Sequence, residues 1–95
     1  MEVAWLEDAL TDIRDIQAYI AADGPRATER MVRRLQEAVV LLAETPLIGR
    51  RGRWPGTREL IVPGTRYIVP YRIRANVIEI LRVMHGARRW PEQTG

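Results

Sequence analysis

The sequence contains no cysteine, lysine, serine or phenylalanine. Without cysteine there can be no disulfide framework, no thiolate nucleophile and no thiolate metal site. The missing serine and lysine exclude serine-hydrolase chemistry, Schiff-base chemistry and a lysine-type phosphate loop. Any catalysis must therefore come from arginine, carboxylates, tyrosine, threonine or the single histidine.

Length and composition are those of one small folded domain. The 95 residues are 46% hydrophobic and 28% charged, which excludes a second folded domain and a disordered chain. No apolar run approaches the roughly 18 residues that a bilayer crossing requires. Acidic residues at positions 2, 7 and 8 come too early for a signal or transit peptide. We expect a single domain over residues 1–95, soluble, cytoplasmic and without membrane contact, with 92–95 as a disordered tail.

Charge is unevenly distributed along the chain. All 15 basic residues are arginine. Residues 1–47 carry five arginines against nine acids, a balance of −4, whereas residues 48–95 carry ten against three, a balance of +7. Genomic base composition can explain arginine in place of lysine, but not why acids become scarce after residue 48. Because the guanidinium fork grips phosphate in two places at once, the C-terminal half is where we expect a polyanion to bind.

The N-terminal half predicts a strand and two helices. Residues 3–6 are typical of a short strand, and apolar residues then recur at spacings of three and four up to about residue 22. That helical stripe contains Leu6, Leu10, Ile13, Ile16 and Ile20. Three aspartates share another face of the same helix, which we interpret as a solvated surface: Asp8, Asp12 and Asp15.

A second helix is expected to begin at Pro25, because proline is favoured at the first helical position and follows Asp23-Gly24. Its end is expected before Pro46, since a residue preceding proline is pushed out of the helical region. Its apolar stripe is Ala27, Met31, Leu35, Ala38 and Leu42, widened by Val39 and Leu41. The short connection makes the two helices a hairpin whose apolar faces must cover another layer.

After an irregular loop over 45–57 the apolar period changes to two. Strands are predicted over 58–62, 66–73 and 77–84, with Pro70 as a bulge or a gap in the ladder. The predicted fold class is α+β: an N-terminal strand, a helical hairpin, and a three-stranded antiparallel meander covered on one face by the hairpin.

Strand alternation constrains which side chains share a face of the meander. It puts Arg82 on the face of Ile78, Ile80 and Met84. It puts Arg72 and Arg74 opposite Tyr67, Val69 and Tyr71. Glu79 is expected to pair with an arginine across the sheet.

The remaining candidate chemistry is an arginine constellation around His85. One histidine and scattered carboxylates match no metal-ligand spacing, so we expect no metal and no cofactor. The ends of neighbouring strands meet in a meander, so we expect the fold to gather arginines from separate segments into one cluster. Its members are Arg50, Arg51, Arg53, Arg58, Arg72, Arg74, Arg82, Arg88 and Arg89.

Such a set suits metal-free cleavage of RNA by its own 2′-hydroxyl. Arginines can stabilise the phosphorane-like transition state, and His85 can supply acid–base help. Aromatic side chains that could stack on a base are Trp54, Tyr67, Tyr71 and Trp90. The alternative is structural: a lone histidine at a strand end is commonly a surface or core residue, and tryptophans are commonly core or partner anchors.

Element order and several short motifs together resemble the RelE/ParE superfamily of bacterial type II toxins. The motifs are residues 12–21, 46–50, 56–60, 67–72, 78–85 and 88–90. The resemblance covers nearly the whole chain. It implies a toxin that a cognate antitoxin protein holds inactive by covering its basic face.

The resemblance implies two alternative targets. RelE-like members cut messenger RNA in the ribosomal A site, and the residues in comparable catalytic places here are Arg58, Arg82, His85 and Arg88. The RNA-binding candidates are Arg50, Arg51, Arg53, Arg72 and Arg89. ParE-like members share the scaffold but act on DNA gyrase. The chain departs from the nuclease pattern in having no lysine and no tyrosine after Trp90. The leading hypothesis is ribosome-dependent mRNA cleavage, the alternative is non-enzymatic gyrase inhibition, and the third is a module with no surviving activity.

Overall fold

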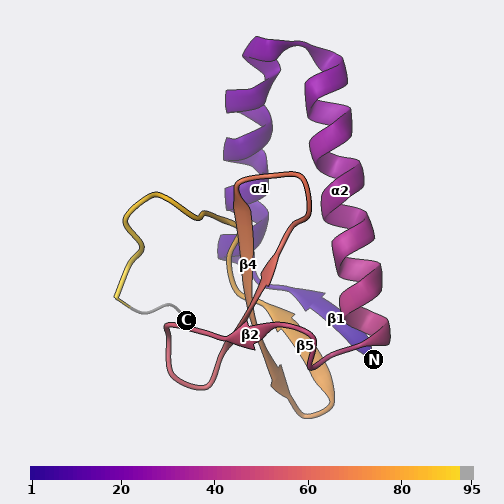
Figure 1. Cartoon of the computed structure of the whole chain (residues 1–95), viewed down its shortest axis with the longest axis vertical. Coiled ribbons are helices and arrows are strands. Elements are labelled where there is room, and N and C mark those ends of the chain that lie inside the picture. Colours follow the sequence, from indigo (N-terminus) through magenta and orange to yellow (C-terminus); the bar gives the residue numbers. More distant parts are fainter. Residues whose placement is uncertain (93–95) are drawn as a thin grey trace.

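The computed structural model describes residues 1–92 (Figure 1). Apart from Glu92, the tail expected to be disordered lies outside the described residues. The elements in chain order are β1 (Glu2–Trp5), α1 (Glu7–Ile20), the 3-10 turn η1 (Ala21–Asp23), α2 (Pro25–Glu44), β2 (Arg50–Arg51), β3 (Arg58–Ile61), β4 (Tyr67–Arg74), β5 (Val77–Ile80) and β6 (Met84–His85).

Helix α1 packs through a face centred slightly differently from the predicted stripe. Ala9 is its one buried residue, whereas Leu10 is 39% exposed. The prediction of Leu10 as a core residue is therefore wrong. A small side chain at position 9 lets the helix backbone approach the sheet closely, and Ile13 then packs against the core one turn further on.

Helix α2 confirms its predicted boundaries and stripe. It starts at Pro25 after Gly24, whose φ of +103° is open to glycine at little cost, and it ends just before Thr45. The buried residues are Met31, Leu35, Ala38 and Leu42. Leu41, expected to widen this stripe, is 40% exposed. Figure 1 shows the two helices running side by side as the predicted hairpin.

The sheet has the strand order β1-β5-β4-β3-β2, with β6 pairing on β4. The predicted antiparallel meander is confirmed in β3, β4 and β5. Strand β1 adds to it in parallel beside β5, and the two-residue β2 adds at the opposite edge. Strand β2 lies inside the segment predicted as an irregular loop, because two residues carry no readable alternation.

The last predicted strand, residues 77–84, is interrupted. Tyr71 pairs with Ile80 and Ile68 pairs with Met84, so three residues of the final segment face two residues of β4. This one-residue bulge lies opposite Pro70, whose carbonyl accepts from the Leu81 amide at 2.9 Å. In a strand, the N–H and the carbonyl of one residue point to the same neighbouring strand. Proline has no N–H to donate there, so the ladder between β4 and the final segment is interrupted at Pro70. The prediction of a bulge or a gap in the ladder at Pro70 is confirmed as a gap, with the extra residue on the facing segment. The prediction of one continuous strand over 77–84 is wrong.

The bulge reverses which side chains face the helices. Directly paired residues share a face, and Met84 pairs with Ile68 while His85 pairs with Tyr67. Tyr67 packs against the core beneath the helices. His85 is therefore on the helix side and Met84 is not, contrary to the expectation that Met84 shares a face with Ile78 and Ile80.

The core lies between the hairpin and one face of the sheet, as predicted. Its buried cluster is Ala9, Leu35, Ala38, Leu42, Leu60, Val62, Val69, Tyr71, Ile78 and Ile80. Side chains buried outside this cluster include Trp54, Ile68, Leu81 and Val83. Neither helix of the described residues is long and apolar enough to cross a bilayer.

Candidate functional site

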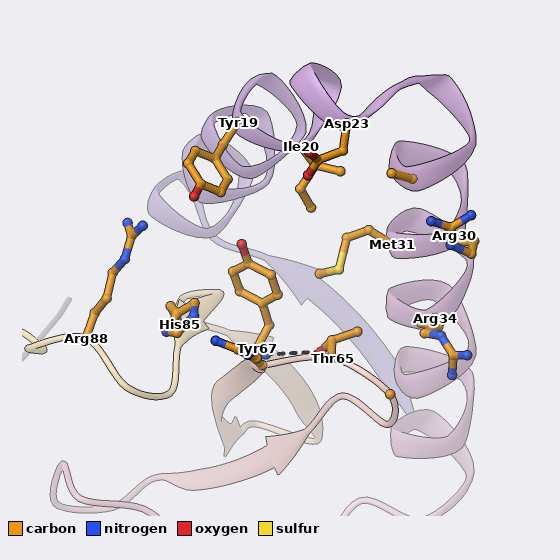
Figure 2. Close-up of a pocket in the computed structure, with 13 residues that line it drawn as sticks. Tyr19, Ile20, Asp23, Arg30, Met31, Arg34, Thr65, Tyr67, His85 and Arg88 are labelled. Atoms are coloured by element: carbon orange, nitrogen blue, oxygen red, sulfur yellow. Dashed lines mark hydrogen bonds between the residues drawn. The ribbon is translucent and has the colours of Figure 1, made fainter.

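Two adjoining pockets lie where the helical hairpin meets β4 and the C-terminal segment. The hairpin pocket, of about 460 Å³, lies between α1, α2 and the turn that precedes β4 (Figure 2). The Arg82 pocket, of about 350 Å³, lies between α1 and the segment 82–89. Four residues line both pockets: Tyr19, Tyr67, His85 and Arg88. These shared residues form the boundary between the two hollows.

His85 is positioned by its pairing with Tyr67. The imidazole meets the phenol ring edge-on, with centroids 5.7 Å apart and planes at 83°. The Ala87 amide donates to Nδ1 at 3.2 Å. Accepting this hydrogen bond assigns the proton of a neutral imidazole to Nε2, which is then the nitrogen that can meet a ligand.

Arg82 is held by a carboxylate of helix α1. Its Nε and Nη2 donate to the two oxygens of Asp12 at 2.7 and 2.9 Å, and the Val83 amide donates to Asp12 Oδ2 at 2.9 Å. Donating to the Asp12 carboxylate raises the pKa of Arg82, which keeps the guanidinium charged. The side chains of Asp12 and Arg82 are only 13% and 21% exposed. The prediction that Asp12 belongs to a solvated acidic face is therefore wrong.

Arg58 lies on the other side of β4 from His85, because β3 and β6 flank opposite edges of that strand. Its Nη1 donates to the carbonyls of Leu47 and Gly49 at 3.1 and 2.9 Å. It therefore secures the loop that follows α2. The structure does not bring Arg58 to the histidine.

Tyr71 secures the same loop from the core. Its hydroxyl accepts from the Gly49 amide at 2.9 Å and donates to the Pro46 carbonyl at 2.7 Å. Burial raises the pKa of Tyr71, an effect opposed by the Gly49 hydrogen bond and by the charge of Arg58. This tyrosine, a candidate for base stacking, is fully buried and unavailable to a ligand.

Glu59 holds two of the loop arginines. It is 3% exposed, and its two oxygens accept from Arg50 Nη2 at 3.2 Å and from Arg53 Nε at 3.3 Å. The Arg53 amide adds a third contact at 2.8 Å. These arginines neutralise a buried carboxylate, so their first role is structural.

In the pairing of β4 with β5, Arg72 faces Glu79 directly. Arg72 Nε donates to Glu79 Oε1 at 2.7 Å, and Arg74 approaches the same oxygen at 3.8 Å. The expected pairing of Glu79 with an arginine across the sheet is confirmed. Arg72 is therefore occupied by an acid as well.

The prediction of a single arginine cluster is wrong. The structure brings together Arg82, His85, Arg88 and Arg89, which all line the Arg82 pocket. A separate hollow of about 660 Å³ in the loop before β3 is lined by Arg51, Arg53 and Arg58. Arg50 and Arg72 are bound to acids elsewhere. Sheet order separates the two pocket groups, because β4 lies between β3 on one edge and β5 and β6 on the other.

Comparison with known proteins decides the family. A family described as "ParE toxin of type II toxin-antitoxin system, parDE" matches residues 3–90. The chain belongs to the ParE toxin family. It is 47% identical to Y4kP of Sinorhizobium fredii over 95% of this chain and 93% of that protein. It is 37% identical to toxin RelE2 of Caulobacter vibrioides, over 92% and 97% of the two chains.

The fold of this ParE-family chain also matches a solved structure. The chromosomal ParDE toxin–antitoxin system from P. aeruginosa aligns with a TM-score of 0.69 and 22% identity, over 90% of this chain and 95% of that one. The likeness supports the fold. The chain is thus a toxin of a type II toxin–antitoxin system, as the resemblance implies, and a cognate antitoxin is its partner.

Sequence reasoning overlooked three residues that the structure brings forward. Asp12 and Tyr19 line the two adjoining pockets, and Glu59 holds the loop before β3. Asp12 and Glu59 act as partners of arginines. A signal for Asp12 existed: an arginine on the face of Ile78 and Ile80 needs a carboxylate from the covering helix. Within residues 1–92 there is no group of three or more histidine or acidic side chains that could hold a metal ion.

Proposed function

We propose that this ParE-family toxin arrests growth by binding DNA gyrase, without cutting RNA. The observation that supports the proposal most directly is the ion pair between Arg82 and Asp12. A cation stabilises a transition state only if it is not already neutralised by a carboxylate and lies where negative charge develops. Arg82 is already matched by a two-point carboxylate bond, and Arg58 is bonded to two carbonyls beyond β4.

The surface that fits this role is the basic loop before β3 together with the helical hairpin. Arg51 is exposed in the hollow of that loop. A protein target is recognised by such exposed side chains on a fixed scaffold. The Glu59 contacts described above hold the loop to the sheet, which prepares it for binding at little entropic cost.

Ribosome-dependent mRNA cleavage is the second candidate, and the His85 group favours it. His85, Arg88 and Arg89 line one pocket, with Nε2 of the imidazole free of the Ala87 contact. This set supplies an acid–base group and two cations near it. It lacks the wider arginine cluster from which the hypothesis began.

The test applies two assays to one preparation of the toxin. Purified gyrase is assayed for plasmid supercoiling, and a translating lysate is assayed for cleaved messenger, each with wild type, His85→Ala and Arg51→Glu. We expect wild type and His85→Ala to inhibit supercoiling at the same toxin concentration. Arg51→Glu should need at least tenfold more toxin for the same inhibition. Messenger should stay intact with all three proteins. Cleaved messenger that disappears with His85→Ala, together with normal supercoiling at high toxin concentration, would establish the second candidate instead. Growth without arrest when the antitoxin is absent would contradict both.

A further inference from the structure

The hairpin pocket combines positive charge with aromatic walls. Among residues 1–92, four arginines line it against a single acid, Asp23. Within residues 1–92 none of these four is in an ion pair, in contrast to Arg50, Arg72 and Arg82. The four are Arg30, Arg34, Arg66 and Arg88. The pocket therefore carries an uncompensated positive charge in a hollow of about 460 Å³, a volume within the usual range of small-ligand sites.

Two phenol rings reach the pocket from opposite layers of the fold. In Figure 2 Tyr67 extends from β4 toward the helices, while Tyr19 extends from α1 on the side of Arg88. The Arg88 guanidinium carbon is 5.8 Å from the centre of the Tyr19 ring. Tyr19 is 68% exposed, so its ring is accessible to a ligand. Apolar side chains of Ile20 and Met31 complete the wall between the rings and α2.

The turn that carries Tyr67 is fixed before any ligand arrives. Thr65 Oγ1 donates to the Val62 carbonyl at 2.9 Å and accepts from the Tyr67 amide at 3.0 Å. Gly64 has a φ of +74°, and a Cβ there would collide with the guanidinium of Arg34. Arg34 in turn donates to the Pro63 carbonyl at 3.3 Å. Arg34 therefore lies against the turn at the edge of the pocket.

We propose that the hairpin pocket binds a nucleotide, with the base against Tyr19 and Tyr67 and the phosphate on the arginines. Aromatic faces bind bases by stacking, and guanidinium groups bind phosphate oxygens in pairs. An aliphatic anion would leave the rings unused, and an uncharged ring would leave the arginines unused. The proposal does not depend on gyrase binding. The pocket shares His85 and Arg88 with the group that favours messenger cleavage, so a bound nucleotide would also suit that second candidate.

The experiment measures binding of 5′-AMP to the purified full chain by isothermal titration. Adenosine, inorganic phosphate and phosphotyrosine serve as partial ligands, and each is expected to bind at least tenfold more weakly. Arg88→Ala is expected to weaken 5′-AMP binding about tenfold, the usual size of one charge-assisted hydrogen bond. Tyr19→Ala should weaken it at least fivefold through lost stacking. Because both side chains are exposed, neither change should unfold the protein.

Matched variants separate a built site from general charge attraction. Arg14→Ala removes an exposed arginine of α1 that does not line the pocket, and Tyr19→Phe keeps the ring. Both should bind 5′-AMP as wild type does. The proposal is overturned if no saturable binding occurs, if Arg14→Ala weakens binding as much as Arg88→Ala, or if phosphotyrosine binds as tightly as 5′-AMP.

A 5′-phosphorylated tetranucleotide identifies where the nucleotide comes from. Tighter binding of the tetranucleotide than of 5′-AMP would assign the pocket to the end of a nucleic-acid strand. Equal or weaker binding would assign it to free nucleotides. Either result supports the site, provided that Arg88→Ala weakens both ligands.

Discussion

Asp12 and Arg82 are 70 residues apart in sequence and are joined by two hydrogen bonds of 2.7 and 2.9 Å. The pair fastens helix α1 to the segment after β5, immediately before the bulge ends at Met84. The Val83 amide adds a third bond to the same carboxylate. Asp12 therefore fixes both the arginine and the backbone from which His85 projects.

Replacing Asp12 with alanine should destabilise the fold by about 2–4 kcal/mol, because it leaves a largely buried guanidinium and a backbone amide without their acceptor. Urea denaturation of the two proteins measures the loss. The double variant Asp12→Ala with Arg82→Met removes the charge as well, and it should recover part of the stability. Strictly additive losses in this cycle would show that the two side chains are not coupled.

Because Tyr71 is buried, we expect the free energy of unfolding to fall at alkaline pH. Burial raises its pKa above the ordinary value of 10.0, so the folded state favours the neutral phenol. The stability from this preference is fully present below pH 10 and is lost as pH rises through the higher folded pKa. Denaturation midpoints at about pH 9 and about pH 11 should differ more for wild type than for Tyr71→Phe. An identical pH response of the two proteins would contradict the assignment.

The Tyr71 hydroxyl also makes Gly49 a demanding position. A Cβ on Gly49 would lie 2.6 Å from Tyr71 Cε1 and 2.6 Å from its hydroxyl oxygen. The Tyr71 side chain is fully buried, so it has little room to move away. Gly49→Ala should therefore cost about 2–3 kcal/mol of unfolding free energy, the usual cost of overpacking. The control is Gly86→Ala, whose nearest neighbour is the flexible end of Ile68 at 3.1 Å. That variant should lose less than about 1 kcal/mol, and equal losses would refute the steric explanation.

Local chemistry explains which elements were predictable. Helix α2 has proline near both ends, Pro25 and Pro46, and an uninterrupted stripe of buried residues, so its bounds follow from the sequence. The meander follows from its period of two. The superfamily likewise rests on motifs whose order covers the chain. Within each element and each motif the deciding residues are near one another in sequence.

The site was less predictable because long-range pairing decides it. The bulge opposite Pro70 moves His85 to the helix side, and its exact place depends on the register with β4. The partner of Arg82 lies on a helix 70 residues away, where three aspartates look alike in sequence. Glu59 looks like an ordinary strand residue, yet burial makes it the anchor for Arg50 and Arg53. Composition could show an excess of arginine but not which arginines are matched by acids.

Trp90 connects the C-terminal segment to the loop before β3, and its contacts should stabilise the fold. Its ring lies 5.3 Å from that of the buried Trp54, the Arg53 guanidinium carbon is 3.5 Å from its centre, and its Nε1 donates to the His85 carbonyl at 3.1 Å. Trp90→Ala should cost about 2 kcal/mol in urea denaturation, since it removes a tilted ring–ring contact, a cation–π contact and a hydrogen bond together. Pro91→Ala is the matched control, because the Pro91 carbonyl that accepts from Trp54 Nε1 at 2.8 Å belongs to the backbone and survives. Comparable losses in the two variants would mean that chain stiffness, and not the tryptophan contacts, holds the segment in place.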